Sequence, residues 1–139
     1  MAITQKTGRQ ALVVAEVAFA FGDLTSGVAA AAVTVPLGAV VVSGAVVVDT
    51  AWNSATSDVI DIGDGGATQR YLAAQDIKTA TGRFPLVPTD FVYTADDTID
   101  AIWTGVSTAP SAGAARLHVE YYVENRRDLT AGGVSRVTV

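Results

Sequence analysis

Three carboxylates, Asp58, Asp61 and Asp64, follow one another at intervals of three residues in the stretch "SDVIDIGDGG". Carboxylates gathered around a glycine turn are ligands that Ca²⁺ accepts, but an EF-hand loop needs oxygen ligands at alternate positions and a closing Glu, which this stretch lacks. A second acidic group of the same kind comprises Asp96, Asp97 and Asp100. Acidic residues that end strands and flank turns are the simpler interpretation. We therefore assign no metal ligand, and a cation at the first group stays an alternative.

The chain has a single histidine, His118, and no cysteine. A zinc site or a catalytic histidine needs partners that such a sequence does not supply, so we interpret His118 as a surface or interface residue. The "GDGG" turn lacks the context of a phosphate-binding loop, and no nucleophile-elbow motif is present. We expect no catalytic residue, no cofactor and no enzymatic activity. A glycosidase with paired catalytic carboxylates remains the enzymatic alternative, because the fold, and not the sequence spacing, sets the distance between two carboxylates.

Aromatic residues are candidates for a second role, contact with a binding partner. We expect Trp52 and Trp103 to lie in the core, with an aromatic sugar platform as the alternative. In "RLHVEYY" the alternation of a strand places one ring of Tyr121 and Tyr122 inward and the other outward. The outward Tyr122, beside His118, is a candidate contact residue because exposed aromatic residues are enriched at interfaces.

The composition excludes several classes of protein. Half of the residues are apolar and 17% are charged, which is unlike a disordered chain and suggests that part of the surface is covered by neighbours. The net charge of -5 provides no general basic field for nucleic acid. The long charge-free stretch at residues 24–48 contains Pro36 and several glycines, so we do not expect a membrane span.

The elements that must position these residues are mostly strands. Residues 11–24 alternate with period two and predict a strand, with a helix as the alternative. Pro36 should end a strand or mark an edge strand, and "VPLGA" predicts a turn. The two valine triplets in residues 38–48 indicate a strand buried on both faces, or one strand with a glycine bulge, shielded by a second sheet. Asp49 and Asp58 would flank this region as charges that discourage edge pairing.

Further along the chain, residues 59–62 predict a strand that ends at a glycine turn. Residues 67–82 predict a short helix of about two turns, which Thr68 would cap and Gly82 would end. Residues 91–93 and 99–103 predict two strands. Residues 115–125 alternate most clearly, and we expect them to pair with residues 99–105 as an antiparallel hairpin.

The ends of the chain differ from the middle. We divide the sequence into an N-terminal arm (1–10), a β-sandwich domain (11–127) and a C-terminal arm (128–139). Five of the nine basic residues lie toward the ends, and they are Lys6, Arg9, Arg126, Arg127 and Arg136. They are candidate interface residues that could dock on an acidic neighbour, with solvated charges as the alternative.

In the order of several segments, the chain resembles small virion structural proteins of tailed bacteriophages, of the capsid decoration or cement type. The shared segments are "VPLGAVV", "SDVIDIGD", "RYLAAQDIK", "TADDTI" and "SAGAARLHVEYYV", and the resemblance covers roughly residues 11–127. It implies a mainly β protein, an antiparallel, jelly-roll-like β-sandwich with one short helix and extended terminal arms. The shared residues belong to turns and the core and carry no chemistry.

The resemblance also implies a function and partners. Proteins of this type bind the capsid exterior, commonly as trimers, and staple adjacent subunits of the major capsid protein. The resemblance therefore implies a homo-oligomer, a trimer, on the outside of the virion, with no direct contact to nucleic acid or membrane. The alternatives are another virion component, such as a tail-tube or head–tail completion protein, and a host-surface carbohydrate-binding module.

Overall fold

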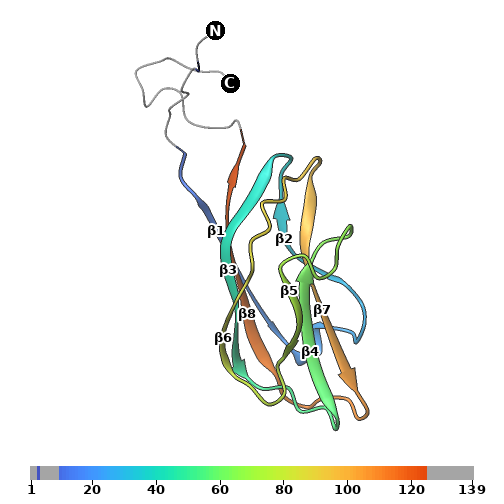
Figure 1. Ribbon diagram of the computed structural model, residues 1–139. Helices are drawn as coiled ribbons and strands as arrows, with labels where there is room; N and C mark the ends of the chain where they lie inside the picture. The colour runs from blue at the N-terminus through green and yellow to red at the C-terminus, as the bar shows by residue number, and fades with distance from the viewer. Residues whose placement is uncertain (1–2, 4–9, 125–139) are drawn as a thin grey trace.

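The computed structural model describes residue 3 and residues 10–124, and these form a sandwich of two β-sheets (Figure 1). One short 3₁₀ helix, η1 (Phe21–Asp23), follows the first strand. The strands, in chain order, are β1 (Val13–Ala20), β2 (Ala30–Val35), β3 (Ala39–Thr50), β4 (Ser57–Gly63), β5 (Leu72–Asp76), β6 (Gly82–Pro85), β7 (Asp97–Val106) and β8 (Ala114–Val123).

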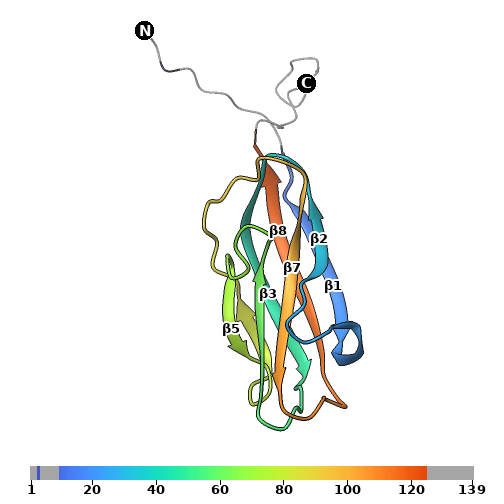
Figure 2. The same ribbon diagram turned by 90° about the vertical axis from the view of Figure 1, so that its right-hand side faces the viewer.

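The strand order identifies the architecture as a jelly roll. One sheet has the order β1-β8-β3-β6 and the other has β2-β7-β4-β5, and every pairing among these strands is antiparallel. The pairs β1–β8, β2–β7, β3–β6 and β4–β5 are those of one long hairpin folded at the β4–β5 connection. Wrapping such a hairpin around a core gives two four-stranded sheets, which is the jelly-roll arrangement. The expected antiparallel β-sandwich is confirmed. Figure 1 shows its two layers side by side, and Figure 2 looks onto the β2-β7-β4-β5 sheet with the other sheet behind it.

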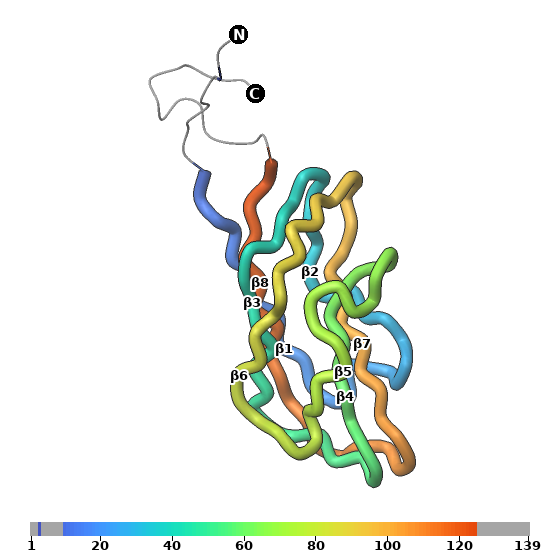
Figure 3. Tube along the Cα trace, viewed as in Figure 1, coloured from blue at the N-terminus to red at the C-terminus, as the bar shows by residue number. Residues whose placement is uncertain are grey.

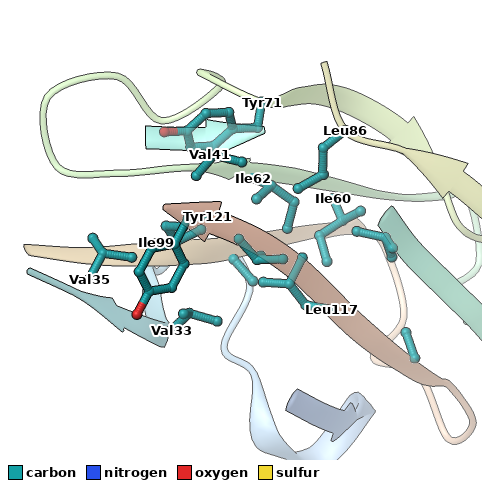
Figure 4. Close-up of a cluster of buried hydrophobic side chains, with 14 of the residues drawn as sticks. Val33, Val35, Val41, Ile60, Ile62, Tyr71, Leu86, Ile99, Leu117 and Tyr121 are labelled. Atoms are coloured by element: carbon teal, nitrogen blue, oxygen red, sulfur yellow. The ribbon is translucent and has the colours of Figure 1, made fainter. Parts of the chain in front are cut away.

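Alternating side chains build the core between the layers. On β8 the inward residues from Ala115 to Val123 are buried, and the residues between them are partly exposed. The inward residues of β7, such as Ile99 and Trp103, face them from the other sheet. Figure 4 shows side chains from both sheets meeting in this core, which removes a large apolar area from water.

The valine-rich stretch forms one long central strand. β3 lies between β8 and β6, and the register with β8 shifts between Val41 and Ser43, which marks a bulge. Val41, Val46 and Val48 are almost completely buried. Ala45, on the opposite face of the strand from Val46, is also completely buried. β3 is therefore one bulged strand that is buried on both faces along part of its length, and this bulge lies between Val41 and Ser43 rather than at a glycine. Before it, β2 ends at Val35, directly before Pro36, on the edge of its sheet, and Gly38 forms the turn with a φ of 89°, as predicted.

One side of the sandwich is closed by the segment between β6 and β7, residues 86–96. It runs along β3, and Leu86 N donates to Gly44 O at 2.9 Å. Val92 forms an isolated bridge with Val40, so the strand expected at residues 91–93 is reduced to one bridge. Val87 N also donates to Tyr71 O at 2.9 Å, which ties this segment to the second sheet. Figure 3 shows it as the yellow trace that climbs past β3.

The expected hairpin of residues 99–105 with residues 115–125 is wrong. β7 pairs with β2 and β4, whereas β8 pairs with β1 and β3 in the other sheet. Both strands bury their alternate apolar residues, but they do so from opposite sides of one core. The connection at residues 107–113 is longer than a tight hairpin needs and carries the chain from one layer to the other.

The expected helix at residues 67–82 is also wrong. This segment forms a turn and then β5, which pairs with β4. Tyr71 and Ile77 are 1% and 0% exposed, and both enter the core from opposite ends of the extended strand. Two turns of helix would leave β4 without a partner on that side. Tertiary pairing therefore outweighs the helix propensity of the alanines and glutamines here.

Candidate interaction surface

The outer face of the β1-β8-β3-β6 sheet carries the two candidate contact residues that the structure describes. His118 and Tyr122 point outward from β8 and are half-buried among their neighbours. Glu16 of β1 is the register partner of His118, and Val40 of β3 is that of Tyr122. Four residues of strand separate them by about 13 Å, so they form two contact points on one face rather than one site. The outward orientation is confirmed, and the contact role stays a prediction.

Charged side chains cross three strands of this face. Arg116 of β8 donates through Nε to Asp49 Oδ2 at 3.0 Å and through Nη2 to Asp49 Oδ1 at 3.1 Å, and its Nη1 lies 3.5 Å from Glu16 Oε2. The hydrogen bond from Arg116 lowers the pKa of the Asp49 carboxyl. All three side chains are about half exposed, so solvent screens the pair and its main effect is to orient the charges.

The other basic candidates, Lys6, Arg9, Arg126, Arg127 and Arg136, lie outside the described residues, as do most of the two arms. The region they flank is strongly acidic, because residues 10–124 contain thirteen Asp and Glu against four Lys and Arg. Gln10 Oε1 accepts a hydrogen bond from Val123 N at 2.6 Å. The two ends of the described region therefore lie side by side at one tip of the sandwich, as Figure 1 shows.

Asp58, which the sequence suggested as a flanking charge, is instead buried. Its Oδ1 accepts hydrogen bonds from Ser54 Oγ at 2.6 Å and Trp103 Nε1 at 2.9 Å, and its Oδ2 accepts one from Ser54 N at 2.9 Å. The side chain is completely inaccessible to solvent. Alternation explains this position, because Asp58 lies on the same inward side of β4 as Ile60 and Ile62. It holds the β3–β4 connection against β7.

Asp64 forms a second buried polar cluster at the β4–β5 connection. Arg70 donates through Nε to Asp64 Oδ2 at 2.6 Å and through Nη2 to Oδ1 at 3.1 Å, and the Tyr93 hydroxyl donates to Oδ2 at 2.9 Å. Burial alone would raise the pKa of Asp64, but hydrogen bonds from Arg70, Tyr93 and Ala67 outweigh it and lower the pKa. Burial, with the hydrogen bonds to Tyr71 and Asp64, raises the pKa of Tyr93. The cluster holds the β4–β5 connection against the β6–β7 connection.

The three carboxylates spaced by three residues do not converge. Asp61 faces outward and accepts hydrogen bonds from Gln69 Nε2 at 3.1 Å and Ala74 N at 2.6 Å, while Asp58 and Asp64 have the partners given above. Among residues 3 and 10–124, no group of three or more acidic, histidine or cysteine side chains is arranged to hold a metal ion. Within the same residues, no helix is long and apolar enough to cross a membrane.

Both tryptophans belong to the core, as predicted. Trp52 is 1% exposed and Trp103 is 5% exposed. A sugar platform needs a ring that faces solvent, so the structure removes the feature on which a carbohydrate-binding role would depend. Phe19 packs against Trp52 with ring centroids 6.2 Å apart, which holds the C-terminal end of β1 against the core.

The side of the sandwich between β1 and β2 stays open and was not predicted. A groove of about 290 Å³ lies there, lined mainly by apolar side chains that include Val17, Phe19 and Leu24 and by Ala30–Ala32 of β2. Val14 on the neighbouring edge is 57% exposed. The only signal in the sequence was the apolar character of residues 11–21, which we interpreted as a strand and not as a contact edge.

Comparisons with known proteins place this fold. Neither a protein-family model nor a curated protein matches the sequence. Among solved structures, a chain of the cyanophage Pam1 capsid asymmetric unit superimposes with a TM-score of 0.64 and 22% identity, covering 88% of this chain and 91% of that one. A chain of the acidic stable capsid structure of Helicobacter pylori bacteriophage KHP30 gives 0.64 and 16%, covering 83% and 90%. The chain thus shares its fold with chains of two phage capsids.

Proposed function

We propose that this chain is a virion structural protein that decorates the outer surface of a phage head. It would act without catalysis, as a homo-oligomer, and staple adjacent major capsid subunits. The observation that carries the proposal is the agreement of fold over about nine-tenths of two chains from phage capsid structures. At 22% and 16% identity the agreement concerns architecture, so the role and the partner are our inference.

The electrostatics and surface of the chain support this role. The sandwich is acidic, the segments before Gln10 and after Glu124 contain basic residues, and the two described ends to which these segments are joined meet at one tip. Such segments can bind an acidic neighbour while the outer face of β8 supplies aromatic and charged contacts. A protein that binds only the expanded shell stabilises it by mass action, and many copies acting together do not each need high affinity.

The test is binding to expanded heads that lack the protein. We expect the purified chain to bind such heads, to appear at regular outer sites in electron micrographs, and to raise the temperature at which DNA is released. A monomer at high concentration that does not bind heads would contradict the proposal. Six-fold rings without head binding would favour a tail-tube component instead.

A pair of variants tests the proposed face. Replacing His118 and Tyr122 together by Ala should weaken head binding about ten-fold, because truncating the side chains that contribute most to an interface costs more than about 1 kcal/mol. Thr104→Ala changes the outer face of the opposite sheet and serves as the matched control. Equal binding by both variants would show that the β8 face is not the contact surface.

A further inference from the structure

The outer edge of β1 differs from the other three edges of the sandwich. β2 contains a register shift between Ala31 and Val33 and ends before a proline, β5 is interrupted by Ala74 with a φ of 47°, and β6 has four residues that end at Pro85. Natural proteins protect sheet edges with bulges, prolines and short strands of this kind. β1 has none of these features, because its eight residues pair with β8 in continuous register.

The hydrogen-bonding groups that face this edge can be assigned. Phe21 N donates to Gly113 O at 3.0 Å, in continuation of the register that pairs Ala20 with Ala114. Hydrogen-bonded and non-hydrogen-bonded positions alternate in an antiparallel ladder, so the backbone groups of Val14, Glu16 and Ala18 point away from β8. Consistently, Ala20 N turns outward and donates to Asp23 Oδ2 at 2.8 Å. Among residues 3 and 10–124, no partner faces these donors and acceptors, so the edge offers three residues to an added strand.

The surroundings of the edge define what could pair with it. On the inner side, an added strand would place alternate side chains over the apolar groove beside Val17. On the outer side it would meet Glu16, whose side chain is 50% exposed and whose nearest basic group is Arg116 at 3.5 Å. The edge therefore fits an extended segment of about six residues with small apolar side chains inward and a basic side chain outward.

The chain contains such a segment, "VSRVTV", at residues 134–139. It has no proline or glycine, is rich in β-branched residues, and carries one positive charge at Arg136. We propose that the edge of β1 receives residues 134–139 of a neighbouring copy as an added antiparallel strand, with Arg136 opposite Glu16. In this register Val137 and Ser135 lie on the groove side, opposite Ala15 and Val17.

A neighbouring copy is the source, rather than the same chain. β8 ends at the tip where β1 begins, so its own continuation would return beside β1 in the parallel direction. All pairings among the described strands are antiparallel, and a neighbour can supply that direction. The proposal rests on the self-association included in the proposed function and adds the contact that produces it.

Disulfide trapping tests the register directly, because the chain has no native cysteine. In the proposed pairing Ala18 lies opposite Val134. Full-length protein carrying Ala18→Cys and Val134→Cys should form disulfide-linked dimers and larger species on oxidation, about ten-fold more than a protein with Ala18→Cys and Thr138→Cys, whose second cysteine lies about 13 Å out of register. Disulfides within one chain, or equal yields from the two proteins, would overturn the proposal.

Charge exchange provides an independent readout. Glu16→Arg and Arg136→Glu should each weaken self-association about five-fold or more in sedimentation equilibrium, and the double exchange should restore it. Failure of the restoration would also overturn the pairing. These measurements use no capsid. Loss of the pairing with retained head binding would therefore refute this inference alone, and trapped pairing without head binding would refute the proposed function alone.

Discussion

The buried ion pair between Asp64 and Arg70 gives the sharpest prediction about stability. Arg70 forms two hydrogen bonds with Asp64, and its guanidinium carbon lies 3.5 Å from the centre of the Phe91 ring. Arg70→Leu removes the cation and leaves a carboxylate that is 2% exposed. Removing one partner of a buried pair costs about 3–5 kcal/mol, and we expect the lower end because Asp64 keeps its bonds from Tyr93, Gly66 and Ala67.

The pH dependence of this loss follows from the pKa of Asp64, which is lower in the folded protein than its ordinary value of 3.8. A depressed carboxyl pKa stabilises the fold above the unfolded-state pKa, and this contribution disappears as the pH falls through the folded-state pKa. Without Arg70, burial should raise the pKa of Asp64. The difference in unfolding free energy between the two proteins should therefore be about 3 kcal/mol at neutral pH. It should shrink as the pH falls, first through the raised pKa of Asp64 in the variant and then through its lowered pKa in the original protein.

Urea unfolding at several pH values, followed by the fluorescence of the two buried tryptophans, measures the loss of unfolding free energy and its dependence on pH. A loss of about 3 kcal/mol lowers the urea midpoint by roughly 1–3 M for typical slopes. Arg83→Leu, at an exposed position of β6, is the matched control and should change the stability by less than about 0.5 kcal/mol. A loss below about 1 kcal/mol for Arg70→Leu, or a difference that does not change with pH, would refute the reasoning.

Two further substitutions test the packing of the sandwich. Trp103→Phe removes one of the three hydrogen bonds to buried Asp58 and should cost about 1–3 kcal/mol of unfolding free energy, measured by thermal unfolding in circular dichroism; an unchanged midpoint would contradict the role given to this bond. Gly44→Ala would place its Cβ 2.4 Å from the His118 carbonyl oxygen and should cost at least about 1–3 kcal/mol, whereas Gly22→Ala, which meets nothing within 4 Å, should have little effect on the same midpoint.

The strands could be predicted where one face is buried and the other is not. Val119 and Tyr121 alternate with Glu120 and Tyr122, and the structure keeps that pattern. The partners of the strands could not be predicted, because the alternation of β7 and β8 is the same whether they share a sheet or face each other across the core. A strand without alternation, such as β5, was not predicted, because it forms by pairing with β4 and no local pattern in the sequence encodes that pairing.

The candidate site shows the same division. The outward direction of His118 and Tyr122 followed from strand parity alone. The burial of Asp58 did not, because a carboxylate inside the core becomes reasonable only once Ser54 and Trp103 are known to donate to it. The groove beside β1 is a property of two edges that lie far apart in the sequence, and periodicity within either strand contains no information about it.

The nested pairing of the jelly roll has a consequence for how the chain folds. Its outermost pair joins Val13 to Tyr121, and the long valine strand β3 needs the same last strand on one side. During synthesis β1 and β3 must therefore wait until β8 has emerged before either gains its principal partner. Proteins with such distant pairings fold slowly and expose apolar strands meanwhile. Yield of this protein should depend on conditions that protect nascent chains, and β8 is the strand that completes the described sandwich.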